Sequence, residues 1–286
     1  MTIGRRAFLG ASIVGVGLVC AACSSTPESP IKRTDKRTDK KVGLVKSSYG
    51  SDASQFGQLY LPDSTEVLGT VVVIHGGFWS SQYDLSLGAP LAADLAKRGW
   101  VAWNIEYRRL GNGGGWPTTF EDVAAAIDHL ATLKDEHPVI DLGRVLTLGH
   151  SAGGHLGTWA AGRTDPRVPL TGIVSQAGVL ELARASRESV GNGFVDQLMG
   201  TTAAADPALF ARADPSAQLP VGIPVHAVHA RGDQMVPFDQ SSRYVAAARA
   251  AGDDATLVEV EGDHFSLIDI RSAAWHNCLA SLNALR

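Results

Sequence analysis

The chain has 286 residues, 45% of them hydrophobic and 19% charged, which suits one large globular domain or two small ones. Its formal net charge at pH 7 is −4, but residues 1–22 carry +2 and residues 23–41 carry +3, which leaves −9 on residues 42–286. An acidic main domain argues against a nucleic acid as the partner.

The first 22 residues predict an export signal. Arg5 and Arg6 precede the apolar run ASIVGVGLVCAAC, and a polar break follows small residues. The paired arginines, followed by Phe8 and Leu9, resemble a twin-arginine signal. The alternative is an ordinary secretory signal that happens to carry two arginines. The apolar run is shorter than the ~20 residues of a membrane-spanning helix, so we do not expect a span here.

The end of this signal resembles the lipobox of bacterial lipoproteins. In Ala21-Ala22-Cys23 the cysteine would be lipidated and become the mature N-terminus, with Cys20 at a position that leucine usually holds. The resemblance implies a lipid anchor at Cys23 on the outer face of the cell membrane. The alternative is cleavage nearby and a soluble secreted or periplasmic protein. Residues 23–42 are a polar linker that is too poor in apolar side chains to order itself.

Residues 43–286 predict one domain in which strands alternate with helices. The β-branched and apolar runs LGTVVVIHGG (68–77) and RVLTLG (144–149) indicate buried strands, and DQSSRYVAAARAAG (239–252) indicates a helix. This alternation predicts an α/β fold whose mainly parallel central sheet has helices on both faces. Functional sites of such sheets lie beyond the carboxyl ends of the strands.

A serine stands at one of these strand ends. Gly149, Ser151 and Gly153 match the pattern G-x-S-x-G between a predicted strand and a predicted helix. A sharp corner forces the serine into a crowded backbone conformation, and the glycines leave room for strand and helix to approach each other. The hydroxyl then projects above the sheet, in front of the helix N-terminus. We therefore predict that Ser151 is a nucleophile; a purely structural turn is the alternative.

The sequence HGGFW follows the Val-Val-Val-Ile strand and predicts an oxyanion hole. Acyl transfer needs N–H donors aimed at the developing oxyanion, and glycines after a strand let backbone N–H groups turn inward. We expect Gly77 or Phe78 to supply one donor and Ala152 the other. The alternative is an ordinary turn. We expect His75 to brace this loop by hydrogen bonding.

Two further strand ends supply an acid and a base. Asp233 in HARGDQMVP is placed to hold the tautomer of a histidine ring, and His264 in EGDHFSLID is placed to act as the general base on Ser151. Asp263 is the rival acid, but it is the sequence neighbour of His264 and cannot easily reach that ring. The chain order Ser, Asp, His is that of α/β-hydrolases.

Together, HGGFW, NIEYRRLGNGGGWP, GHSAGGHL, HARGDQMVP and GDHF resemble the α/β-hydrolase esterases that include bacterial feruloyl-esterase-like proteins and kynurenine formamidases. The resemblance implies the α/β-hydrolase fold over residues 43–286, with Ser151 as nucleophile, Asp233 as acid and His264 as base. It implies a small-molecule ester substrate and no cofactor. Phe78 replaces the third oxyanion glycine of hormone-sensitive-lipase-like esterases, which sets the chain apart from that group.

Trp79 and Trp116 are predicted to wall an acyl or aryl pocket, with core packing as the alternative. No carboxylate or cysteine cluster indicates a metal site. The sequence thus predicts a serine hydrolase that cleaves small to medium carboxylic esters through an acyl-enzyme intermediate. The alternatives are an arylformamidase, a prolyl-oligopeptidase-like peptidase and, in another class, a non-catalytic surface binding protein.

Overall fold

The central feature of the structure is an eight-stranded sheet with the order β1-β2-β4-β3-β5-β6-β7-β8. The computed structural model describes residues 42–285. The strands are β1 (Gly43–Ser48), β2 (Phe56–Leu61), β3 (Thr70–Ile74), β4 (Val101–Ile105), β5 (Val145–His150), β6 (Gly172–Gln176), β7 (Val225–Ala230) and β8 (Ala255–Val260). Strands β1 and β2 pair antiparallel, as do β2 and β4, and every other pair is parallel. The predicted α/β-hydrolase fold with a mainly parallel sheet is confirmed.

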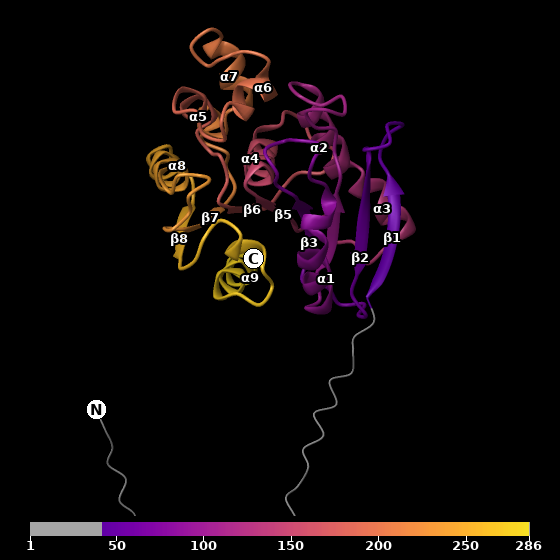
Figure 1. Cartoon of the computed structure of the whole chain (residues 1–286). Coiled ribbons are helices and arrows are strands. Elements are labelled where there is room, and N and C mark those ends of the chain that lie inside the picture. The colour runs from indigo at the N-terminus through magenta and orange to yellow at the C-terminus, as the bar shows by residue number, and fades with distance from the viewer. Residues whose placement is uncertain (1–41, 286) are drawn as a thin grey trace, which may run out of the picture. The chain divides into compact units, whose positions relative to one another are not determined.

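Helices cover both faces of this sheet (Figure 1). They are α1 (Ala89–Lys97), α2 (Thr118–Asp128), α3 (Leu130–Glu136), α4 (Ala152–Trp159), α5 (Leu182–Arg187), α6 (Phe194–Met199), α7 (Pro207–Ala213), α8 (Asp239–Ala250) and α9 (Ala273–Ala284). Short 3-10 turns lie at η1 (Leu85–Leu87), η2 (Ala160–Gly162), η3 (Pro215–Gln218) and η4 (Ser266–Ile268).

The alternation of side chains along β3 explains the two layers. Val72 and Ile74 belong to the core cluster that holds the buried faces of α2, α3 and α4, whereas Val71 and Val73 belong to the cluster under α1 and α9. Successive strand residues point to opposite faces, so a strand that is covered on both sides is apolar throughout. All five residues of β3 are buried, which accounts for its continuous β-branched run.

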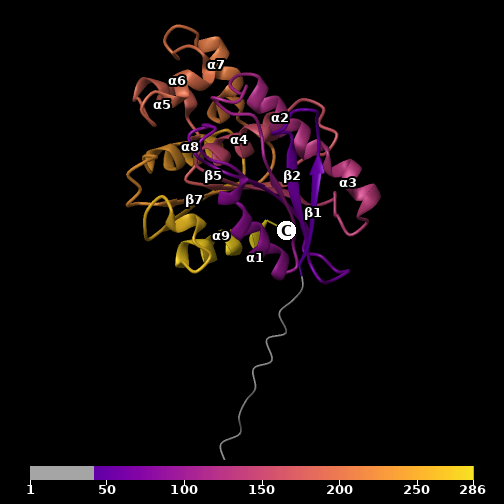
Figure 2. The same ribbon diagram turned by 45° about the vertical axis from the view of Figure 1, so that its right-hand side comes forward.

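The segment between β6 and β7 carries α5, α6 and α7. It lies beyond α4, at the top of the views in Figures 1 and 2. The chain leaves β6 at the carboxyl ends of the parallel strands, so this inserted segment is placed beside the edge where functional residues are expected.

The predicted export signal (1–22), its cysteine Cys23 and the linker up to residue 41 lie outside the described residues. Within residues 42–285, no helix has the length and apolar character needed to cross a membrane.

Candidate active site

Ser151 occupies a tight corner between β5 and α4. Its φ of 55° and ψ of −116° lie in a sparsely populated region for a residue with a side chain, and such strain costs on the order of 1–3 kcal/mol. The flanking glycines make the corner sterically feasible. A Cβ on Gly153 would lie 2.0 Å from the Ile74 oxygen, and one on Gly149 would lie 2.1 Å from the Gly153 oxygen. The corner therefore requires glycine at both positions.

A histidine and a carboxylate meet at the ends of β7 and β8. His264 Nδ1 donates to Asp233 Oδ2 at 2.6 Å, and Asp233 Oδ1 accepts from the backbone N–H groups of Met235 (2.8 Å) and Val236 (2.9 Å). Both side chains are buried. Because β7 and β8 are adjacent and parallel, residues 31 positions apart are brought together. A proton on Nδ1 leaves the Nε2 lone pair of the neutral ring free to accept a proton.

Asp263, the rival acid, is held within its own turn. Its Oδ1 accepts from the N–H of Phe265 (3.1 Å), the N–H of Ser266 (2.9 Å) and the hydroxyl of Ser266 (2.7 Å). These local bonds keep the carboxylate on the turn, so the structure brings His264 to Asp233 and not to Asp263.

The histidine before Ser151 connects the corner to the His264 loop. His150 Nε2 donates to the backbone oxygen of His264 at 2.9 Å, and the two ring centroids are 4.5 Å apart. Burial, together with the positive charge that His264 can carry, lowers the pKa of His150 to about 3. In the described residues, Ser151 Oγ and His264 make no direct hydrogen bond, and in unliganded sites such bonds are often long.

A second histidine lies behind the carboxylate of Asp233. His229 Nε2 is 3.2 Å from Asp233 Oδ2 and 3.1 Å from the Val236 oxygen, while Nδ1 contacts Ser241 Oγ at 2.8 Å. Burial by itself would raise the pKa of Asp233, but hydrogen bonds from His229, from His264 and from backbone N–H groups hold it well below the usual range. Asp233 is therefore a permanent carboxylate. The sequence interpretation gave His229 no role, although its place four residues before Asp233 at a strand end is a usable signal.

The HGGFW loop lies against the serine corner. A Cβ on Gly76 would lie 2.7 Å from the His150 oxygen and 3.1 Å from Ser151 Cβ. Gly77 and Phe78 have φ values of 112° and 56°, and in the described residues their N–H groups donate to no protein acceptor. The first N–H groups of a helix also have no partner inside it. Ala152, the first residue of α4, is in that position. The predicted oxyanion donors are therefore free to bind a ligand.

His75 anchors this loop from below. Its Nδ1 contacts the Gly76 oxygen at 2.8 Å and its Nε2 contacts Glu106 Oε1 at 3.2 Å. Burial tends to raise the pKa of Glu106, but hydrogen bonding to His75 and to backbone N–H groups lowers it below the ordinary value. Glu106 also pairs with Arg109 at 2.9 Å. This buried network supports the loop.

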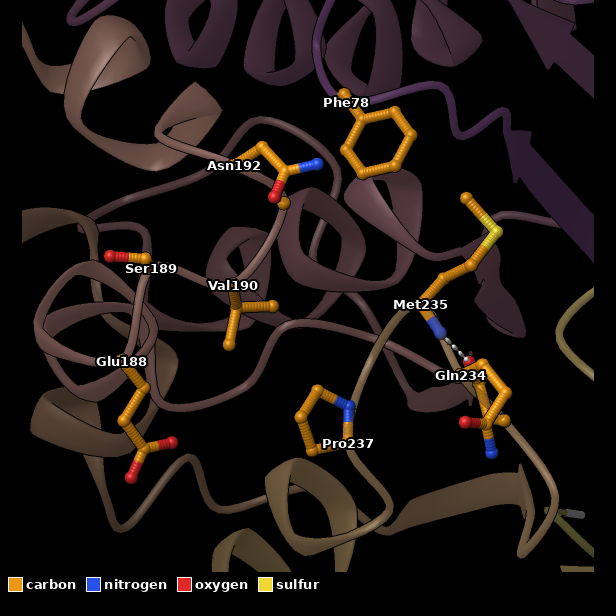
Figure 3. A pocket seen from close by; sticks show the side chains of 10 residues that line it. Phe78, Glu188, Ser189, Val190, Asn192, Gln234, Met235 and Pro237 are labelled. Carbon is orange, nitrogen blue, oxygen red and sulfur yellow. Dashed lines mark hydrogen bonds between the residues drawn. The ribbon is translucent and has the colours of Figure 1, made fainter.

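Two adjoining hollows lie beside Ser151, at the carboxyl ends of the parallel strands. A small apolar inner cavity is lined by Ser151, Ala152, Phe78, Trp79, Val179, Val190, Gly191, Val195, Met235 and Val236. An outer cleft of about 490 Å³ is lined by Phe78, Glu188, Ser189, Val190, Gly191, Asn192, Asp233, Gln234, Met235 and Pro237. Figure 3 shows Val190 and Asn192 on one loop and Met235 and Pro237 on another, with Phe78 above them. This edge of the sheet therefore has an apolar and a polar region side by side.

The two predicted pocket tryptophans lie in different places. Trp79 lines the inner cavity and is also buried in the core cluster. Trp116 does not line it, which corrects the expectation of a shared wall. It packs edge to face on Phe120, with ring centroids 4.7 Å apart and the Arg212 guanidinium 5.2 Å from its ring, and it lines a separate cleft between α2 and α7. In residues 42–285 no group of histidine, cysteine and carboxylate side chains could hold a metal ion.

Comparisons with known proteins agree with this fold. The family model described as BD-FAE matches residues 58–247, and a comparison with curated proteins gave no significant match. Similar solved structures include a truncated carbohydrate esterase from gut microbiota (20% identity, TM-score 0.70, 86% of this chain and 96% of that chain). Esterase B from Lactobacillus rhamnosis is 22% identical (TM-score 0.72, 87% and 86%). Esterase Est2 from Thermogutta terrifontis with bound propionate is 22% identical (TM-score 0.67, 85% and 93%).

Proposed function

The chain belongs to the BD-FAE family, and from this premise we propose that it is a serine hydrolase that cleaves small to medium carboxylic esters through an acyl-enzyme intermediate. The observation that carries the proposal is the 2.6 Å contact between His264 Nδ1 and Asp233 Oδ2 beside the strained corner of Ser151. This contact fixes a base whose free nitrogen can serve a nucleophile. The similar solved structures are esterases, which supports an ester as the substrate.

The first step forms the acyl-enzyme. When substrate binds, His264 Nε2 takes the proton of Ser151 Oγ while Oγ attacks the ester carbonyl carbon. The N–H groups of Ala152 and of Gly77 or Phe78 stabilise the oxyanion. The carbon–oxygen bond to the alcohol then breaks, and His264 gives its proton to the departing alcohol oxygen.

The second step releases the acid. Water loses a proton to His264 Nε2 and attacks the acyl carbon, and Ser151 Oγ leaves with the returned proton. In both steps His264 is transiently charged, and the permanent carboxylate of Asp233 stabilises that charge. Because Asp233 also accepts hydrogen bonds from Met235 and Val236, it holds the ring in one orientation.

Ester turnover and labelling of the serine test this proposal. The full chain should hydrolyse p-nitrophenyl acetate, and a fluorophosphonate should label Ser151. Ser151→Ala should abolish both, whereas Ser242→Ala on α8, which lines neither hollow, should change neither. Turnover of N-formylkynurenine or of a prolyl peptide without ester turnover would favour a formamidase or a peptidase. A wild-type chain that is inactive and unlabelled would favour a non-catalytic binding protein.

We also propose that the protein is exported and anchored to the outer face of the cell membrane by a lipid on Cys23. The motif Ala21-Ala22-Cys23 after an apolar segment supports this proposal. Wild-type protein expressed in a lipoprotein-processing host should partition into detergent, and Cys23→Ser should partition into the aqueous phase. Equal partitioning of both would refute the anchor and favour a soluble exported protein.

A further inference from the structure

The inner cavity and the outer cleft share one wall. Phe78, Val190, Gly191 and Met235 line both hollows, so these residues separate the two. The inner cavity has about 10 Å³ of space open to a water-sized sphere, which is close to the least that one water molecule needs. The outer cleft, at about 490 Å³, is in the range of small-molecule binding sites.

The catalytic geometry of the proposed function assigns one half of an ester to each hollow. The leaving alcohol must reach His264 Nε2 to receive its proton. His264 lines neither hollow, but the loop of Asp233, whose carboxylate holds the opposite ring nitrogen, lines the outer cleft. Ser151 and Ala152, the proposed nucleophile and oxyanion donor, line the inner cavity. The acyl substituent beside the attacked carbon therefore points into the inner cavity, and the alcohol occupies the outer cleft.

We propose that Phe78, Val190, Gly191 and Met235 form an acyl wall that, with Val195 closing the cavity behind it, limits the acyl group to the size of acetyl. This inference rests on the proposed serine hydrolase function and deepens it. The outer cleft carries Glu188 and Asp233 and has no lysine or arginine in its lining. An uncharged polar alcohol suits this lining, because Glu188 already pairs with Arg184 at 2.7 Å and the buried Asp233 carboxylate is bonded to His264, so the lining residues supply no cation to hold an anion.

Packing holds the acyl wall in place. Gly191 has a φ of 72°, and a Cβ there would lie 3.2 Å from the Phe78 ring, so the backbone of the loop lies directly against that ring. Phe78 also stacks on Phe194 of α6 with ring centroids 5.4 Å apart. Val190 is buried, and its N–H donates to the Ala185 oxygen at 2.9 Å. A longer acyl chain would have to displace this loop.

The acyl wall can be tested by measuring how kcat/KM depends on the acyl-chain length of the ester in variants whose wall side chains are shortened to alanine. The wild-type chain should prefer p-nitrophenyl acetate over butanoate and hexanoate, because a misfit of one methylene in a closed pocket changes kcat/KM by about 10–200-fold. Val195→Ala and Met235→Ala should each raise the butanoate-to-acetate ratio of kcat/KM at least about tenfold. Val195 is buried and lines the inner cavity but not the outer cleft. Met235 is partly exposed, so Met235→Ala should disturb folding less than Val195→Ala.

The matched control is Val245→Ala, which removes the same atoms from the buried face of α8 and lines neither hollow. Its butanoate-to-acetate ratio should equal that of the wild type. A wild-type profile that is flat from acetate to hexanoate, or ratios unchanged in both Val195→Ala and Met235→Ala, would overturn the acyl wall while fluorophosphonate still labels Ser151. Absence of both labelling and ester turnover would instead remove the proposed function, and the acyl wall with it.

Discussion

Replacing Asp233 with asparagine isolates the part of the site that holds the base. Asp233 Oδ1 accepts from two backbone N–H groups, those of Met235 and Val236, at 2.8 and 2.9 Å. In Asp233→Asn the single amide oxygen should keep these bonds, which turns the NH₂ group toward His264 Nδ1. The ring must then carry its proton on Nε2 and cannot accept the Ser151 proton.

The expected loss of kcat follows from the hydrogen bonds that the side chain at position 233 accepts. Turning the amide over would restore the active tautomer but would give up two hydrogen bonds of about 1 kcal/mol each, so the active orientation is about 30-fold less populated. Loss of the charge beside the transient imidazolium adds to this. An aspartate-to-asparagine change that selects the wrong tautomer lowers kcat about 10⁴-fold, and we expect about 10³–10⁴-fold here. That is about 4–5 kcal/mol in activation free energy.

The assay is the hydrolysis of p-nitrophenyl acetate at pH 7–8, with thermal unfolding measured on the same samples to show that the variant is folded. The control is Asp263→Asn, because the carboxylate of Asp263 bonds only within its own turn. It should keep kcat within a factor of about three, as expected for a surface change. If Asp233→Asn kept more than a tenth of the wild-type kcat, or if Asp263→Asn lost as much, the assignment of Asp233 to His264 would be refuted.

Three further predictions concern stability. Gly153→Ala would place a Cβ 2.0 Å from the Ile74 oxygen, so denaturant unfolding should show a loss of about 3 kcal/mol or more, together with loss of esterase activity. Burial lowers the pKa of His155 to about 4, against about 6.5 unfolded, so the unfolded state binds more protons below pH 6.5. This residue should contribute about 2 kcal/mol to the stability lost from pH 7 to pH 5, and an equally steep loss in His155→Gln would contradict this. Glu106→Gln removes the carboxylate that neutralises the buried Arg109, so the free energy of unfolding should fall by about 3 kcal/mol. An unchanged melting temperature would contradict the stabilising role of this ion pair.

Local sequence patterns were sufficient for the fold and for the serine corner. A β-branched run such as that of β3 is buried at every position because both faces of a parallel sheet are covered. Gly149 and Gly153 indicate the corner because any side chain there meets backbone atoms. The sequence also favoured Asp233 over Asp263 on the ground that a residue cannot easily reach the ring of its own neighbour, and the structure places the carboxylates accordingly.

Other features depend on which segments meet in space. Trp116 was predicted to wall the pocket beside Ser151. In the structure its ring packs on Phe120, outside the inner cavity. The bond from His150 to the His264 oxygen joins residues 114 positions apart. No local pattern encodes such a contact, because it depends on the relative positions of β5 and the loop after β8.

The sequence by itself determined the alternation of strands and helices, the glycine-flanked serine and the identity of the residues at the strand ends, since each follows from periodicity and backbone sterics within a few positions. It did not show the strand β1 or the break between α2 and α3. Only the tertiary structure decided how much room lies beside Ser151. That volume is set by the loop of Val190 and by Met235, which lie on segments far apart in the chain. Cavity size is a property of packing among distant segments, and packing is fixed only when the whole core has formed.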